Sequence, residues 1–155
     1  MKKTKQIIFG SILATILIVG GILFFATGQD KFELEEVPVI LYETSDEAKM
    51  GAAIEVSHFG GIAGTPSGKS FSMYPMIKTG DWIALINYDY NDLEEGMTVA
   101  FQRQIGDIII VHTLWYKVDD GWKTRGTNNK ENDSVFMNES EFKYKLHSIH
   151  RPKNK

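Results

Sequence analysis

The chain has 155 residues, no cysteine and a formal net charge of −3 at neutral pH. The absence of cysteine excludes stabilisation by disulfides, and the acidic balance argues against a nucleic-acid-binding protein, which would carry an excess of basic residues. This length suffices for a single domain with its own hydrophobic core.

The first element along the chain is an apolar run without any charge at residues 7–26. A helix needs about 20 apolar residues to cross a bilayer core, whereas the apolar part of a cleavable signal peptide usually has about 7 to 15. We therefore predict a transmembrane anchor at residues 7–26. Removal as a signal peptide, with cleavage near Ala26, is the alternative.

The charges on either side of this run predict its orientation. Residues 1–6 contain three lysines, while the part beyond the run begins its acidic residues at Asp30 and holds 14 basic and all 20 acidic residues, a net charge of −6. Positively charged flanks stay in the cytoplasm. We therefore expect a single-pass protein of the cell membrane, with residues 1–6 cytoplasmic and everything after the anchor extracytoplasmic.

Residues 27–67 are interpreted as an extracytoplasmic lead-in segment. Val37–Tyr42 predicts a strand, and Ser45–Ile54 predicts a short helix with Ser45 as its N-cap. The glycine-rich stretch at residues 59–68 predicts a flexible or tightly turned approach to the domain that follows.

Residues 68–155 have the pattern of a mostly β domain, because short runs of β-branched and aromatic residues alternate with turn residues. Asp119-Asp120-Gly121 lies between two such runs and indicates a hairpin. The segments predicted as strands are Trp82–Asn87, Thr98–Phe101, Ile108–Tyr116, Trp122–Thr124 and Phe142–Ile149.

The most specific motif is Ser72-Met73-Tyr74-Pro75, followed by Gly80-Asp81. It resembles the nucleophile box of type I signal peptidases, whose usual form is Ser-Met-x-Pro with Gly-Asp a few residues on. The resemblance implies Ser72 as the nucleophile, and an oxyanion hole made of the Ser72 N–H and the Ser70 hydroxyl. It also implies that residues 68–155 adopt the β fold shared by signal peptidases and SOS-response repressor proteases, preceded by one N-terminal transmembrane helix.

A serine hydroxyl needs a base to act as a nucleophile at neutral pH, and His112 is the candidate. Its placement resembles the endoplasmic-reticulum-type and sporulation-type signal peptidases, which use histidine where most bacterial enzymes use lysine. Those relatives read Val-His-Arg, and Thr113 stands here in place of the arginine. Two alternatives stay open: His112 as an ordinary core residue on an apolar strand face, and Lys117 as the base, although strand alternation puts it on the opposite face.

The same relatives carry a loop of the form Thr-Lys-Gly-Asp-x-Asn that ends in a second aspartate. This chain reads TRGTNNKEND from Thr124 to Asp133. Thr127 replaces the first acid of that loop, and Asp133 matches the second. The resemblance therefore implies Asp133 as the carboxylate that orients the imidazole of His112.

These motifs predict a membrane-anchored serine endopeptidase that cleaves exported or membrane-proximal polypeptides. The expected partners are a polypeptide substrate and the lipid bilayer, without nucleic acid, and neither a cofactor nor a metal is expected because the other histidines lack metal-ligand spacing. A catalytically silent, membrane-tethered relative that binds peptides or assists a secretion complex is the alternative, since Thr113 and Thr127 depart from the family pattern. An autoproteolytic regulator is a third hypothesis, against which the anchor argues.

Overall fold

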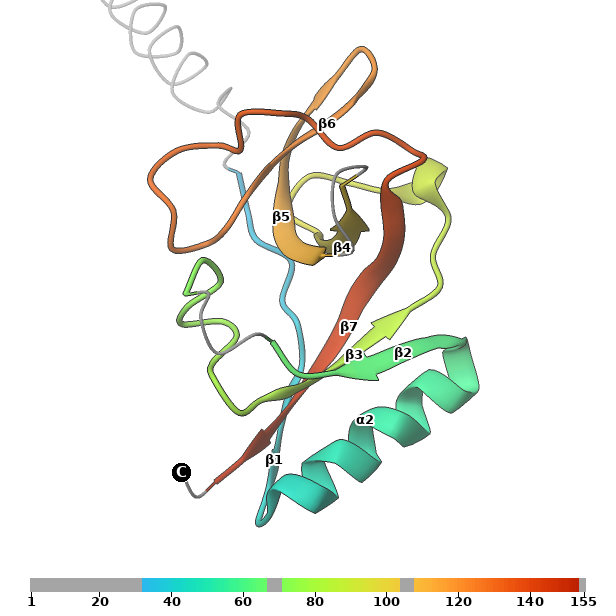
Figure 1. Cartoon of the computed structure of the whole chain (residues 1–155), viewed down its shortest axis with the longest axis vertical. Coiled ribbons are helices and arrows are strands. Elements are labelled where there is room, and N and C mark those ends of the chain that lie inside the picture. The colour runs from blue at the N-terminus through green and yellow to red at the C-terminus, as the bar shows by residue number, and fades with distance from the viewer. Residues whose placement is uncertain (1–31, 67–70, 104–107, 154–155) are drawn as a thin grey trace, which may run out of the picture. The chain divides into compact units, whose positions relative to one another are not determined.

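A computed structural model of the chain describes residues 32–66, 71–103 and 108–153. These belong to one compact unit, Phe32–Lys155. Within them, the chain forms a seven-stranded sheet, one α-helix and one short 3-10 turn. Figure 1 shows how the labelled strands and the helix are arranged. The prediction of a mostly β domain is confirmed.

The sheet is antiparallel except at one strand. Its order is β2-β3-β7-β4-β5-β6, and β1 pairs in parallel with the end of β7. The long strand β7 therefore pairs with β3, β4 and β1 and forms the centre of the sheet. The bounds are β1 (Val39–Tyr42), β2 (Gly61–Gly64), β3 (Trp82–Ile86), β4 (Thr98–Gln102), β5 (Ile109–Val118), β6 (Gly121–Arg125) and β7 (Phe142–Pro152).

All five segments predicted as strands in residues 68–155 are strands, with ends shifted by a few residues. Strand β2 was not predicted, because its sequence Gly-Ile-Ala-Gly lacks the β-branched and aromatic density of a strand. Strand β2 pairs through its backbone with β3 in antiparallel orientation, and Gly61 lies opposite Ile86. A Cβ at Gly61 would come within 2.0 Å of the Leu85 carbonyl oxygen, so this pairing requires glycine.

The helix α2 (Ser45–Phe59) is longer than predicted and begins with a different cap. Thr44 is the N-cap: its hydroxyl accepts from the Glu47 N–H, and the Glu47 carboxylate accepts from the Thr44 N–H. This reciprocal capping box fixes the first turn. Buried Ala48 and Ala52 let α2 pack closely on the sheet. Residues of the predicted lead-in segment thus form part of the same compact unit as the following strands.

The two faces of β4 separate two hydrophobic clusters. Ala100 points into the first cluster, and its neighbours Val99 and Phe101 point into the second, as strand alternation requires. The first cluster consists of Met73, Ile77, Ile83, Leu85, Ala100, Leu146 and Ile149. The second consists of Leu93, Met97, Val99, Phe101, Leu114, Trp122 and Met137. Burial of each large aliphatic side chain contributes about 1.5–3 kcal/mol to stability.

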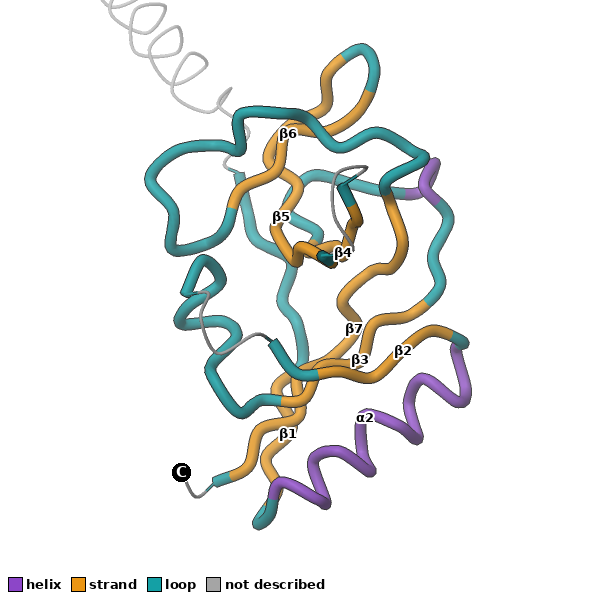
Figure 2. The backbone as a smooth tube through the Cα atoms, in the orientation of Figure 1, coloured by secondary structure: helices purple, strands orange, loops and turns teal. Residues whose placement is uncertain are grey.

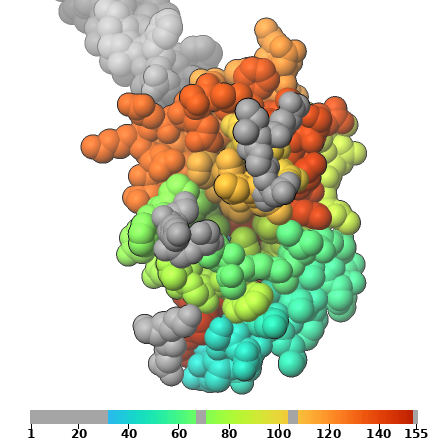
Figure 3. Space-filling view, in the orientation of Figure 1, coloured from blue at the N-terminus to red at the C-terminus, as the bar shows by residue number. Residues whose placement is uncertain are grey.

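Two further features bear on the site. The connection between β6 and β7 is mostly irregular chain, drawn as loop in Figure 2. In the space-filling view of Figure 3, the orange segment, which contains β6 and the connection after it, forms the upper part of the visible face, and α2 with β2 forms the lower right part.

No helix within the described ranges is long and apolar enough to cross a membrane. The predicted anchor at residues 7–26 and the basic residues before it lie outside those ranges.

Candidate active site

Ser72 stands at the start of a tight turn that the core holds in place. The Tyr74 N–H donates to the Phe71 carbonyl at 3.1 Å, and the Ile77 N–H donates to the Met73 carbonyl at 3.0 Å. Met73 and Ile77 are each 6% exposed and pack in the first hydrophobic cluster. The turn is therefore anchored by the burial of Met73 and Ile77, while Ser72 itself is half-buried.

Asp81, from the Gly-Asp part of the motif, has a structural role. Its side chain is buried and accepts from the Lys78 N–H at 2.8 Å. The Arg151 guanidinium binds both carboxylate oxygens, at 2.9 and 2.7 Å, and also donates to the Met76 carbonyl at 2.9 Å. This fork ties the Ser72 turn to β7, and the bidentate geometry satisfies a charge that would be costly to bury alone.

His112 lies in the middle of β5 and reaches Ser72 directly. Its Nε2 is 3.1 Å from Ser72 Oγ, and the side chain lies opposite Val99 of β4. His112 is 8% exposed, and the edge of its ring faces the Phe101 ring with 6.4 Å between centres. The predicted pairing of nucleophile and base is thus a contact in the structure.

Asp133 occupies the other side of the imidazole. Its Oδ2 lies 2.7 Å from His112 Nδ1 and accepts from Thr124 Oγ1 at 2.5 Å. An ionised carboxylate has only acceptors, so Nδ1 carries the proton in neutral imidazole and Nε2 presents its lone pair to the serine hydroxyl. The three predicted residues therefore form one continuous chain of hydrogen bonds, Asp133–His112–Ser72.

The charge of Asp133 is stabilised by its surroundings. Burial by itself raises the pKa of this carboxyl, but hydrogen bonds from His112 and Thr124 oppose that effect, assisted by the charges of His112 and Arg103. The net result is a pKa below the ordinary value. Asp133 is consequently ionised near neutral pH, as a residue that orients and stabilises an imidazolium must be.

Backbone contacts fix Asp133 to β6. The Asp133 N–H donates to the Thr124 carbonyl at 2.8 Å, and Lys123 Nζ donates to the carbonyls of Asp133 and Ser134 at 3.0 and 3.1 Å. These roles of Thr124 and Lys123 were not predicted. The available signal was their position, since both lie in the predicted strand Trp122–Thr124 and Thr124 is the first residue of the loop motif.

The loop that ends at Asp133 also holds the turn that carries Ser72, through Asn128 and Gly126, whose roles were not predicted. The Asn128 N–H donates to the Ser72 carbonyl at 2.7 Å, and its side-chain amide donates to the Phe71 carbonyl at 3.1 Å. Gly126 allows this approach, because a Cβ there would lie 2.5 Å from the Ser72 carbonyl oxygen and 2.7 Å from its Cβ. One loop therefore positions both ends of the hydrogen-bonded chain.

The remaining predicted residues are placed as follows. Ser70, the expected second oxyanion donor, lies outside the described residues. Lys117, the rival base, is exposed and its Nζ lies 5.6 Å from the centre of the Trp122 ring, whereas His112 contacts Ser72. Thr113, which replaces the family's arginine, is buried and its hydroxyl lies 3.1 Å from that of Thr98.

A cavity of about 290 Å³ opens beside Ser72 and His112. The first part of β5 forms one wall of the cavity. Strand β4 pairs with one edge of β5 along this part, whereas β6 pairs with the other edge of β5 only from Thr113 onward. Among the described residues, that second edge has no strand partner before Thr113. Apart from Ser72 and His112, the residues that line the cavity are mostly aliphatic, and they include the β5 wall: Pro66, Met73, Ile77, Lys78, Thr79, Ile83, Ile108, Ile109, Ile110 and Val111.

Within the described ranges, no cluster of three or more histidine, aspartate or glutamate side chains is arranged to hold a metal ion. No protein-family model matches the chain, and no curated protein sequence matches it. Its function is therefore inferred from the geometry of the site.

Proposed function

We propose that the protein is a membrane-anchored serine endopeptidase of the signal-peptidase type. The observation that carries the proposal is the hydrogen-bonded chain Asp133–His112–Ser72, with distances of 2.7 and 3.1 Å, at the edge of an apolar cavity. Serine and carboxylate on opposite nitrogens of one imidazole are what general-base activation of a serine requires.

In the proposed reaction, Ser72 Oγ attacks the carbonyl carbon of a peptide bond while His112 Nε2 takes its proton. The imidazolium is stabilised by Asp133 and returns the proton to the leaving amine as the C–N bond breaks. A water molecule, activated by the same imidazole, then hydrolyses the ester on Ser72 and restores the hydroxyl. Each step moves one proton between His112 and a reacting group, so charge is balanced throughout.

The negative charge on the tetrahedral intermediate needs hydrogen-bond donors. The resemblance to signal peptidases assigns this role to the Ser72 N–H and the Ser70 hydroxyl. Loss of one such donor typically costs about 10²-fold or more in turnover, so Ser70→Ala is the variant that examines this assignment.

The substrate is proposed to be an extended polypeptide segment. Among the residues that the structure describes, one edge of β5 has no strand partner before Thr113, so it can offer backbone donors and acceptors to an added strand. The aliphatic cavity beside it can take an apolar side chain. The resemblance further suggests small side chains near the cut and a scissile bond close to a membrane helix.

A serine-directed acylating inhibitor is the direct test. We expect a covalent adduct on Ser72, located by mass spectrometry of peptides from the full-length membrane protein, and none in Ser72→Ala. Ser148→Ala, which removes a different buried serine, should label like the wild type. Failure of the folded wild type to label would instead favour the silent, peptide-binding relative.

The membrane topology is a separate part of the proposal. Protease added to intact cells should digest the region after residue 30, because the lysine-rich start of the chain favours the cytoplasm. Complete protection of that region would contradict an outward-facing enzyme.

A further inference from the structure

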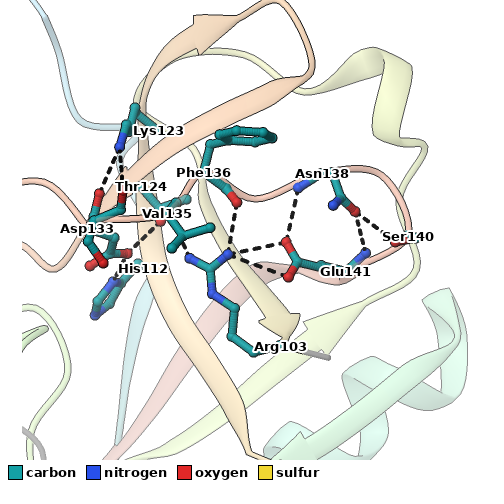
Figure 4. A network of polar contacts seen from close by, with 11 residues as sticks. Arg103, His112, Lys123, Thr124, Asp133, Val135, Phe136, Asn138, Ser140 and Glu141 are labelled. Atoms are coloured by element: carbon teal, nitrogen blue, oxygen red, sulfur yellow. Dashed lines mark hydrogen bonds and ion pairs between the residues drawn. The ribbon is translucent and has the colours of Figure 1, made fainter. Parts of the chain in front are cut away.

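Arg103 contacts the connection between β6 and β7 just beyond Asp133. It lies one residue past the end of β4, and its guanidinium donates to the Val135 carbonyl from Nη2 and to the Phe136 carbonyl from Nη1, each at 2.8 Å (Figure 4). These carbonyls belong to the second and third residues after Asp133. The fork therefore holds the backbone that continues directly from the carboxylate.

Glu141 holds the guanidinium from the other end of the same connection. Its Oε2 lies 3.2 Å from Arg103 Nη1 and accepts from the Asn138 N–H, also at 3.2 Å. The side chains of Arg103 and Glu141 are 21% and 8% exposed. A partly buried, multiply bonded pair of this kind is far more restrained than an exposed surface ion pair.

Arg103 also reaches the histidine side of the site through one aromatic ring. The guanidinium carbon lies 5.0 Å from the centre of the Phe101 ring, and the centre of the same ring lies 6.4 Å from that of the His112 imidazole. Phe101 is fully buried. A single side chain thus supports the backbone that carries Asp133 and the ring that packs against His112.

We propose that Arg103, held by Glu141, is a positioning residue that sets the distance and orientation of Asp133 relative to His112. Arg103 is not among the residues that line the cavity. Because its fork holds the backbone two and three residues after Asp133, we expect its main effect on the site to pass through Asp133. Its effect on turnover rests on the proposed function, whereas its effect on Asp133 does not require turnover.

The electrostatic contribution points the same way. Among the groups that lower the pKa of Asp133, the hydrogen bonds of His112 and Thr124 come first, and the charge of Arg103 adds to them. Lysine at position 103 would keep the charge but lose the planar fork that spans two carbonyls. Arg103→Lys and Arg103→Gln therefore separate positioning from charge.

The experiment combines carbon-13 NMR titration of the Asp133 carboxyl with steady-state kinetics. Arg103→Gln should raise the pKa of Asp133, and Arg103→Lys, which keeps the charge but loses the fork that positions the carboxylate, should raise it by a smaller amount. Both should lower kcat by up to about 10²-fold, the usual cost of misplacing a catalytic group by about 1 Å, with KM little altered. Lys143→Gln is the matched control: it removes a cation that donates to the Ser140 carbonyl of the same connection, and it should change neither quantity.

A double-mutant cycle decides whether Arg103 acts through Asp133. In the Asp133→Asn background, Arg103→Gln should cause little further loss of kcat, because residues that act as a unit are non-additive. A full, additive loss would overturn the proposal, as would an unchanged Asp133 pKa together with unchanged kcat in Arg103→Gln. Glu141→Gln, which loosens the fork without removing it, should give smaller effects in the same direction and serves if Arg103→Gln does not fold.

The outcome that refutes the proteolytic function is distinct from the outcomes that refute the role of Arg103. A wild type without turnover or inhibitor adduct refutes the proteolytic function, while the titration of Asp133 in the Arg103 variants still reports whether Arg103 positions it.

Discussion

In the part of the chain that the structure describes, a serine, a histidine and a carboxylate meet in two places, and the imidazole has different partners in each. In the candidate site, carboxylate and serine occupy opposite nitrogens of the ring. In the second group, Ser148 Oγ and Glu55 Oε2 both lie on the Nε2 side of His150, at 2.9 and 3.4 Å, and Tyr42 Oη lies 2.9 Å from Nδ1. The Ser148 hydroxyl donates to Glu55 rather than to the imidazole. Nδ1 of His150 therefore faces a phenol, whereas Nδ1 of His112 faces a carboxylate, and His150 is not arranged to take the proton of Ser148.

The two groups also differ in access. His150 and Ser148 are 0% and 1% exposed, whereas Ser72 and His112 line the cavity. Glu55 comes from α2 and Tyr42 from β1, so the second group ties these elements to β7. Burial, followed by the charge of Glu55, raises the pKa of Tyr42, whose hydroxyl is hydrogen-bonded to His150 Nδ1. Under the proposed function, the same residue types serve reactivity in one place and packing in the other.

The largest expected contrast is between the two serines. Ser72→Ala should reduce kcat by about 10⁴-fold or more, since the nucleophile of a serine protease cannot be replaced by other parts of the site. Ser148→Ala should leave kcat near the wild-type value and lower the free energy of unfolding by about 1–3 kcal/mol, because Glu55 and His150 lose a buried hydrogen-bond partner. Steady-state kinetics and urea denaturation measure the two effects.

His112→Ala should be as damaging as Ser72→Ala, and the double variant should be little worse than either alone. Near-native turnover in His112→Ala, combined with loss in Lys117→Ala, would show that the base has been misassigned.

The next contrast is between the two carboxylates. Asp133→Asn should keep the fold but lower kcat by up to about 10⁴-fold, because an amide can hold the imidazole in the wrong tautomer. Glu55→Gln should act on stability and not on kcat, because Glu55 has no contact with the cavity. A loss below about tenfold in Asp133→Asn, equal to about 1.4 kcal/mol of barrier, would reduce the site to a Ser72–His112 dyad.

A smaller effect concerns acid stability. The pKa of Asp133 is lowered in the folded protein, while an aspartate in an unfolded chain titrates near pH 3.9. The stabilisation that this shift supplies is fully present above about pH 4 and is lost as the pH falls through the folded-state pKa. The difference in unfolding free energy between wild type and Asp133→Asn should therefore shrink between neutral pH and strong acid, measured by urea titrations at both. A difference that stays constant or grows in acid would contradict the shift.

The sequence supplied the strands and the names of the site residues, but not the contacts that hold them. β-branched and aromatic runs identified β3 to β7, and family-like motifs singled out Ser72, His112 and Asp133. Strand β2 was missed because its pairing depends on the exposed backbone of β3 and on glycine, not on side-chain pattern. Contacts between distant segments have no local signature.

Arg103 illustrates that limit. Its partners, Val135 and Glu141, lie 32 and 38 positions further along the chain. From the sequence, an arginine just after a strand would be interpreted as an ordinary surface cation. Only the path of the β6–β7 connection brings two carbonyls within hydrogen-bond distance of the Arg103 guanidinium. His150 shows the converse, since the sequence alone does not separate its Ser-x-His arrangement from a reactive one.

The smallest expected effect sharpens the comparison from the packing side. Tyr42→Phe removes only the hydroxyl that is hydrogen-bonded to His150 Nδ1, so the free energy of unfolding should fall by about 0.5–1.5 kcal/mol with kcat unchanged. Gly51→Ala should destabilise more, because its Cβ would lie 2.1 Å from Tyr42 Oη and force α2 away from β1. Urea denaturation and kinetics on the same preparations measure both quantities. If Tyr42→Phe lowered kcat as strongly as Asp133→Asn, the second group would have to be coupled to the first, and the division between a reactive and a structural histidine would not hold.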